Sequence, residues 1–227
     1  MKDEDPMRQT SVVDDVMRAA LELFADQGYA NTSVQQLVET AGVTKGALYH
    51  YFQSKDDLLF AIYERILSVQ TEHLQAIVDR GAGVHQTLRE VCVDVVETSV
   101  DFLLEGTVFF RSQHMLSAPR QAEVTRRRRA YHDVFTGLLT RGQDEGLYRT
   151  DIPVTVMAAH FFSDLHYLSS WYSPAGPEDK TTLAEQLTDM FLVSIAASSQ
   201  HPAPKPSSQT SSRSSRNQKA KPPNPQE

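Results

Sequence analysis

The segment from Thr44 to Lys55 carries the residue types that contact DNA phosphates and the edges of DNA bases. Gly46 has no side chain, so its backbone can approach a phosphate or a base edge closely. Thr44 offers a hydroxyl, and the helix that begins after it offers backbone amides, which are phosphate donors. The candidates for DNA contact are Thr44, Lys45, Gly46, Tyr49, His50 and Lys55.

Helical spacing divides this segment into two faces. Ala47, Leu48 and Phe52 share the face that can anchor a short helix inward. The opposite face then presents Lys45, Gly46, Tyr49 and His50 to a partner. Tyrosine and histidine can donate to phosphates or contact base edges and thymine methyl groups, so this helix is a candidate recognition helix.

Two short helices joined by a tight turn must position these groups. Ser33 followed by Gln36 matches a capping box at the start of a helix over residues 34–41. Gly42 ends that helix, and Thr44 caps the next one over residues 45–51. This arrangement is a helix-turn-helix, in which the second helix enters the major groove.

The charge of the chain limits how DNA could be bound. The net charge is −7, and residues 1–55 alone carry five basic and eight acidic side chains. Most of these acids lie in the N-terminal arm and the first helix, whereas Lys45 and Lys55 flank the recognition helix. A DNA-binding face must therefore be local, because no bulk positive field exists.

Helical periodicity extends along most of the chain, which predicts an all-α protein of about nine helices. An N-terminal three-helix domain over residues 1–53 precedes a larger helical domain over residues 54–198. A Ser- and Pro-rich tail over residues 199–227 is predicted to be disordered and solvated, although its net charge of +4 also permits non-specific DNA contact. The helices are expected over residues 11–27, 34–41, 45–51, 54–80, 84–104, 107–116, 120–145, 153–171 and 181–197.

The stretch over residues 19–66, with FADQGY, TSVQQL, AGVTKGALYHYF and SKDDLL, resembles the DNA-binding domain of the TetR (tetracycline-repressor) family. The resemblance implies a homodimeric repressor that places one recognition helix in each of two successive major grooves of operator DNA. It implies phosphate contacts from Ser33, Thr44, Tyr51 and Lys55, and a dimerising, ligand-binding domain in the remaining helices. Tyr51 stands where the commonest variant of the motif has a second histidine.

The ligand must be argued from side chains in the larger domain. Aromatic and polar residues between Val108 and Met115 suit a small-molecule cavity, and ordinary core packing explains them equally well. The candidate ligand-binding residues are Phe109, Phe110, Arg111, Gln113, His114, Phe135 and Trp171.

Two further features bear on the class of ligand. Four successive arginines, residues 126–129, must point around the whole helix, so at least one should lie against the bundle. There it could hold a phosphate or carboxylate, although salt bridges or solvation are the alternative. The segment over residues 171–176 resembles a turn of TetR relatives that sense acyl-CoA thioesters. We therefore expect a lipophilic or acyl-CoA-like effector, and a drug-like or antibiotic molecule is the alternative.

Two apolar stripes near the C-terminus predict an isologous four-helix dimer interface. One stripe lies on the penultimate helix and the other on the last helix, where it includes Leu183 and Met190. The residues assigned to the interface are Phe161, Leu165, Leu168, Tyr172, Leu187 and Phe191.

Other functions find little support in the sequence. Neither a Gly-x-Ser-x-Gly elbow nor a Gly-rich phosphate loop occurs, so we expect no enzyme, no catalytic residue and no cofactor. His160 and Asp164 share a helix face, but His166 lies about 120° away, so no metal site is expected. Cys92 stands in an apolar run and reads as a buried hydrophobe.

The remaining predictions concern location and a competing function. We expect a cytoplasmic protein without membrane contact, because no apolar run is long enough to cross a bilayer and no secretory signal begins the chain. A helical interaction protein that does not bind DNA is the remaining alternative. The acidic balance of residues 1–55 is its support.

Overall fold

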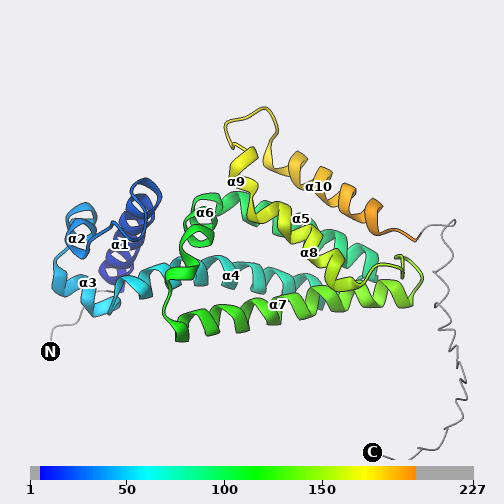
Figure 1. Cartoon of the computed structure of the whole chain (residues 1–227), viewed down its shortest axis with the longest axis horizontal. Coiled ribbons are helices and arrows are strands. Elements are labelled where there is room, and N and C mark those ends of the chain that lie inside the picture. The colour runs from blue at the N-terminus through cyan, green and yellow to red at the C-terminus, as the bar shows by residue number, and fades with distance from the viewer. Residues whose placement is uncertain (1–5, 198–227) are drawn as a thin grey trace, which may run out of the picture.

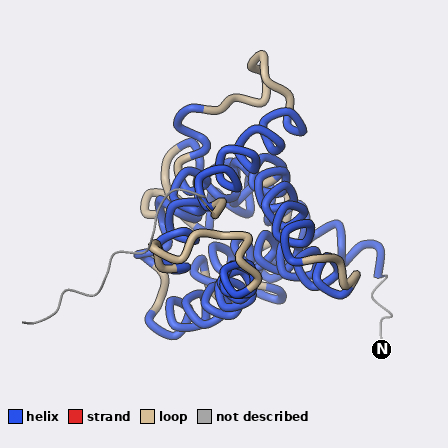
Figure 2. The backbone as a smooth tube through the Cα atoms, turned by 90° about the vertical axis from the view of Figure 1, so that its right-hand side faces the viewer, coloured by secondary structure: helices blue, strands red, loops and turns tan. Residues whose placement is uncertain are grey.

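The computed structural model describes residues 6–197. Over this range the protein forms ten α-helices and one 3₁₀ turn, with a single isolated β-bridge between Tyr148 and Ala196 and no β-strand. Figure 2 shows helices and connecting loops throughout this part. The prediction of an all-α fold is confirmed, whereas the predicted disorder of residues 199–227 lies outside the described residues.

Three helices form the N-terminal unit: α1 (Pro6–Asp26), α2 (Val34–Ala41) and α3 (Lys45–Tyr51). They lie together at one end of the molecule (Figure 1). The Ser33–Gln36 capping box is present as predicted. Gly42 ends α2 with φ of 66°, a left-handed conformation that glycine adopts without steric cost. Local turn chemistry therefore fixes the angle between α2 and α3.

Helix α4 (Lys55–Asp79) joins the N-terminal unit to the rest of the protein. It begins beside α1 and α3 and continues alongside α7 through the larger domain (Figure 1). Leu58, Leu59 and Ile62, near its start, are almost completely buried. One uninterrupted helix therefore takes part in both units.

The larger domain packs around α5, which contacts α4, α6, α7 and α10. Its buried face is rich in valine and includes Cys92. The elements of this domain are α5 (Val84–Asp101), α6 (Leu103–Ser112), the 3₁₀ turn Gln113–Met115, α7 (Ala118–Asp144), α8 (Val154–His166), α9 (Leu168–Trp171) and α10 (Lys180–Ile195).

Two predicted helix boundaries are wrong. The helix expected over residues 153–171 breaks at Tyr167, which has φ of −107° and ψ of 13°, so α8 and α9 are separate and the described helices number ten. Gly106, expected to separate two helices, lies inside α6, where its amide donates to the carbonyl of Phe102 at 2.8 Å. The chain turns at Phe102 instead.

Candidate functional site

Helix α3 presents the polar face that its spacing predicts. Leu48 and Phe52 are buried, while Lys45, Gly46 and Tyr49 are exposed. Tyr49 is 48% exposed although it is a large aromatic side chain. His50 and Thr44 are exposed beside them. The exposed groups thus form one continuous surface at the end of the N-terminal unit.

The two predicted phosphate-binding hydroxyls also hold helix ends. Thr44 Oγ1 accepts a hydrogen bond from the amide of Ala47 at 3.1 Å, and Ser33 Oγ accepts one from the amide of Gln36 at 3.2 Å. Both residues remain exposed. Their caps orient the first turns of α3 and α2, whose amides face the same region as the hydroxyls.

Lys55, a predicted phosphate contact, makes hydrogen bonds within the protein. Its Nζ donates to the carbonyl of Tyr29 at 2.6 Å, to that of Thr32 at 2.9 Å and to that of Ala30 at 3.4 Å. It also lies 4.4 Å from the centre of the Tyr29 ring. Burial lowers the pKa of Lys55. In this conformation the ammonium group connects the loop after α1 to the start of α4.

Tyr51, the other phosphate contact implied by resemblance, is half-buried. It packs against the hydrophobic core, and its ring meets that of His50 edge-on with the centroids 4.7 Å apart. Contacts with the core and with the His50 ring therefore orient the Tyr51 side chain.

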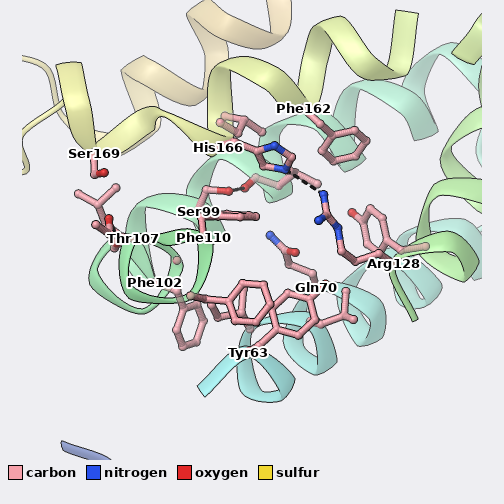
Figure 3. Close-up of a pocket in the computed structure, with 18 of the residues that line it drawn as sticks. Tyr63, Gln70, Ser99, Phe102, Thr107, Phe110, Arg128, Phe162, His166 and Ser169 are labelled. Carbon is pink, nitrogen blue, oxygen red and sulfur yellow. Dashed lines mark hydrogen bonds between the residues drawn. The ribbon is translucent and has the colours of Figure 1, made fainter. Parts of the chain in front are cut away.

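A cavity of about 100 Å³ lies in the larger domain, enclosed by α4 to α9. Its walls are largely aromatic: Tyr63 stacks on Phe109 with ring centroids 3.9 Å apart, and Phe110 and Phe162 contribute further rings. Figure 3 shows Gln70 reaching from α4 into the space between Phe110 and Arg128. Apolar walls with a few polar groups are typical of small-molecule sites.

Arg128 and His166 form the polar side of the cavity. A guanidinium nitrogen of Arg128 lies 3.2 Å from Nε2 of His166 (dashed in Figure 3), and the group lies 5.8 Å from the Phe110 ring centre. Burial, together with the charge of Arg128, lowers the pKa of His166 to about 4. His166 is therefore neutral at pH 7, and Nε2 accepts the hydrogen bond.

Tyr131 adds a buried hydroxyl to the cavity lining. The residue is 5% exposed, and its hydroxyl has no hydrogen-bond partner among the described residues. Burial raises the pKa of Tyr131, and the nearby Asp94 adds to this effect. The group is thus a neutral hydrogen-bond donor at physiological pH.

The arginine run divides as helix geometry requires. Arg126 and Arg127 donate to Glu123, and Arg127 also pairs with Glu64 at 2.9 Å. Arg129 is exposed, and only Arg128 of the four lines the cavity. The run of four arginines therefore indicated that one of them faces inward, but helical periodicity alone did not show that it is Arg128.

Only two of the seven predicted ligand-binding residues, Phe109 and Phe110, line the cavity. Gln113 and His114 instead border a separate open hollow, which Arg128 also lines. Arg111 is exposed, and Trp171 is 52% exposed.

Phe135 is fully buried and stacks on Phe161, with ring centroids 5.5 Å apart, so it belongs to the core. Several cavity residues were not predicted from the sequence, because packing between distant helices decides what lines a cavity. Those missed are Tyr63, Gln70, Arg128, Tyr131, His132, Phe162 and His166.

The predicted dimer-interface residues face the interior of the protomer. Phe161, Leu168, Tyr172 and Phe191 are buried, Leu165 lines the cavity, and Leu187 is half-buried. The strongest apolar stripes pack within the chain, and a second set of apolar side chains stays outside. Val156 is 54% exposed, Tyr167 72%, Met190 70% and Val193 77%.

Comparison with protein families decides the identity of this architecture. Residues 16–62 match the model for bacterial regulatory proteins of the tetR family. Residues 81–195 match the model for the tetracyclin repressor-like C-terminal domain. The chain belongs to the TetR family. It is a transcriptional regulator with a helix-turn-helix domain and a helical C-terminal domain, and members of this family are DNA-binding regulators, not enzymes.

Relatives of known identity agree with this assignment. The transcriptional repressor KstR2 of Rhodococcus jostii is 26% identical over 193 residues, covering 84% of this chain and 92% of the relative. The structure of the ketosteroid regulator KstR2 of Mycobacterium tuberculosis has a TM-score of 0.71 at 22% identity, covering 86% of this chain and 98% of that one. AibR, solved with isovaleryl coenzyme A and operator DNA, has a TM-score of 0.66 at 23% identity, covering 82% and 98%.

Several sites considered from the sequence take no part in this arrangement. His160 and Asp164 are exposed, whereas His166 faces the cavity, and no group of three metal-binding side chains occurs within residues 6–197. Cys92 is buried, and burial raises the pKa of its thiol. Among the described helices none is both long and apolar enough to span a membrane.

Proposed function

We propose that the protein is a homodimeric cytoplasmic repressor that leaves its operator when a small lipophilic or acyl-CoA-like effector enters the cavity. The observation that carries this proposal is the position of α4. Tyr63, Ile66, Leu67 and Gln70 of this helix line the cavity, while its first turns are buried against the DNA-binding unit.

The DNA contact is assigned to the exposed surface of α3. Lys45 supplies charge, Gly46 allows close approach, and Tyr49 can contact a base edge or a phosphate. Thr44 and His50 flank them, and Ser33 and Tyr51 contribute at the edge of the surface. This division agrees with the exposure of each group.

A second connection between the two domains supports coupling. Asp56 accepts hydrogen bonds from the amide and the hydroxyl of Ser117, at 3.0 and 2.7 Å. Asp57 accepts one from Arg120 at 2.7 Å. The start of α4 is thus attached to the start of α7, which also lines the cavity. An effector that favours one arrangement of α4 and α7 shifts the population of DNA-binding conformers by its differential affinity.

The class of effector is supported by the cavity and by two relatives. Aromatic walls favour a lipophilic molecule, and Arg128 also lines an open hollow of about 440 Å³ that could admit a polar head group. One relative is named a ketosteroid regulator, and another was solved with isovaleryl coenzyme A. A drug-like or antibiotic molecule is the second candidate, because the aromatic lining suits it equally.

Dimer formation is assigned to the outer faces of α8 and α10. Val156, Met190 and Val193 are apolar and more than half exposed. An isologous contact would bury the same faces of both protomers and fix the spacing of the two α3 helices.

The test is a footprint and mobility-shift titration on the DNA upstream of the protein's own gene, with and without a series of acyl-CoA thioesters. We expect protection of two half-sites about 10 base pairs, one helical turn, apart, and release by at least one thioester. Replacing Lys45 and Tyr49 together with alanine should weaken binding about 100-fold if each contact contributes about 1–2 kcal/mol.

The control is Arg141→Ala, an exposed change at the far end of α7. Unchanged DNA affinity of the double variant would overturn the assigned surface. Release by lipophilic drugs and by no thioester would favour the second candidate.

A further inference from the structure

Among the described residues that line the cavity, Arg128 is the one with a permanent charge, and no carboxylate of this part of the chain pairs with it. Its neighbours Arg126 and Arg127 both bind Glu123, but no salt bridge within the described residues includes Arg128. Its hydrogen-bond partner there is His166. The positive charge of this half-buried guanidinium is not compensated by a carboxylate, although buried charges are normally paired.

The two histidines beside Arg128 add no charge to the cavity lining. Burial and the charge of Arg128 lower the pKa of both His132 and His166, which keeps them uncharged at neutral pH. The side chains that line the cavity therefore carry a net positive charge, which an anionic ligand would neutralise.

Tyr131 provides a second, independent observation. Its hydroxyl is buried and has no hydrogen-bond partner within residues 6–197, although buried polar groups are almost always hydrogen-bonded. Tyr131 follows Arg128 by three residues on α7, so the two side chains lie on the same face of the helix. Both are donors, and both line the cavity.

The size and the walls of the cavity describe the rest of the ligand. Its volume is about 100 Å³, and aromatic side chains surround it. An apolar protein cavity of about 150 Å³ binds benzene. The space here is smaller than that cavity, so a single small ring is the largest apolar group it accommodates without rearrangement, and Arg128 and Tyr131 are among the residues that line it.

We propose that the effector is an anion, a small ring-containing acid whose carboxylate binds the guanidinium of Arg128 and the hydroxyl of Tyr131. The carboxylate neutralises the charge of the guanidinium, and it accepts a hydrogen bond from the tyrosine hydroxyl. This inference rests on the proposed function, because a bound acid is an effector only if the protein is a ligand-controlled regulator. Binding of the acid itself requires no DNA and is measured separately.

The experiment titrates the full-length protein with benzoate and cyclohexanecarboxylate, by calorimetry and thermal shift, against the neutral amides of the same acids. We expect each acid to bind about 10-fold or more tightly than its amide, the effect of a charge-assisted hydrogen bond. Arg128→Gln should abolish this preference, and Tyr131→Phe should weaken acid binding about 3- to 10-fold. Arg129→Gln, an exposed change on the same helix, is the matched control and should bind like the natural protein.

Equal affinity for acids and amides would overturn the proposal, and so would the absence of binding by either acid at millimolar concentration. The comparison of acid with amide in the natural protein stands even if a variant fails to fold. A third arm uses the coenzyme A thioester of cyclohexanecarboxylic acid. Thioester binding that requires Arg128, without binding of the free acid, would assign the anion to the coenzyme phosphates and reject the carboxylate. Acid binding without any operator binding would reject the proposed function alone.

Discussion

At the scale of single residues, His166 shows how burial sets a protonation state. Its imidazole lies in the cavity wall beside the Phe110 ring, with centroids 4.4 Å apart, and accepts a hydrogen bond from Arg128. A charged imidazolium there would lose that bond and face a guanidinium. The folded protein therefore favours the neutral form of this histidine.

This preference makes stability depend on pH. The pKa of His166 falls from an ordinary 6.5 to about 4 in the folded state, so the unfolded chain takes up the proton first as pH falls. The associated stability is complete above about pH 6.5 and is lost progressively toward pH 4. We expect His166→Gln to lose about 1 kcal/mol less free energy of unfolding than the natural protein between pH 7 and pH 5.

Urea titrations at the two pH values measure this difference. His160→Gln, an exposed change on the same helix, is the control and should keep the pH dependence of the natural protein. Parallel pH dependence in the natural protein and His166→Gln would show that His166 does not titrate between these values.

Lys55 gives a second prediction at this scale. Its three bonds to backbone carbonyls connect the loop after α1 to α4. Lys55→Met should lower the free energy of unfolding by about 1 kcal/mol, because it leaves partly buried carbonyl acceptors without a charged donor. Lys45→Met, which removes an exposed lysine, should change stability by less than about 0.5 kcal/mol.

Thermal unfolding at one fixed protein concentration compares the two variants. If Lys55→Met were as stable as Lys45→Met yet bound the operator more weakly, Lys55 would be a phosphate ligand as the sequence suggested.

At the scale of elements, the connection between α4 and α7 is the feature most relevant to signalling. Arg120 of α7 pairs with Asp57 in the first turn of α4 and lies 4.2 Å from the centre of the Phe60 ring. The pKa of Asp57 is lowered, although burial opposes this, because Arg120 and Ser54 donate to its carboxylate. One arginine side chain thus contacts two consecutive turns of α4.

Arg120→Ala should loosen the start of α4. We expect amide hydrogens of residues 57–60 to exchange about 5-fold faster, corresponding to the loss of about 1 kcal/mol in this partly buried pair. Hydrogen exchange with mass spectrometry measures the change, and Arg141→Ala at the exposed far end of α7 is the control. Exchange that rises equally in α4 and in α10 would indicate general destabilisation instead of a local connection.

At the scale of the whole molecule, the exposed apolar side chains on α8 and α10 contrast with the buried ones beside them. Arg89 of α5 pairs with Glu185 and Asp189 of α10, which holds that helix against the protomer. Its buried side includes Leu183 and Phe191, so Met190 and Val193 remain on the outside. Exposed apolar faces of this kind mark association surfaces.

Met190→Lys combined with Val193→Lys should convert the dimer to a monomer, because it places charges in the proposed interface. Operator affinity should fall by about 100-fold or more, because half of the recognition surface is then lost. Sedimentation velocity and mobility shift measure the two effects. Val134→Lys, which changes a 39% exposed residue of α7, is the control and should remain dimeric. A double variant that stays dimeric would place the interface elsewhere.

The sequence by itself determined most of the helices and the exposed surface of α3, but neither the break at Tyr167 nor the place of Gly106 inside α6. Ser33, Gly42 and Thr44 set helix ends through contacts within a few residues, and a period of 3.6 residues separated the buried Leu48 from the exposed Tyr49. Such features depend on local geometry, which a single chain segment contains.

Only the tertiary structure decided what each face packs against. Periodicity identified four arginines that point in different directions, but the packing of α7 against α8 brought Arg128 to His166, 38 residues away. Lys55 likewise met carbonyls 23 to 26 residues earlier in the chain. The apolar stripe of Phe161 and Leu168 is buried within the protomer, whereas Met190 and Val193 stay exposed, because burial within the chain removes the larger apolar surface from water.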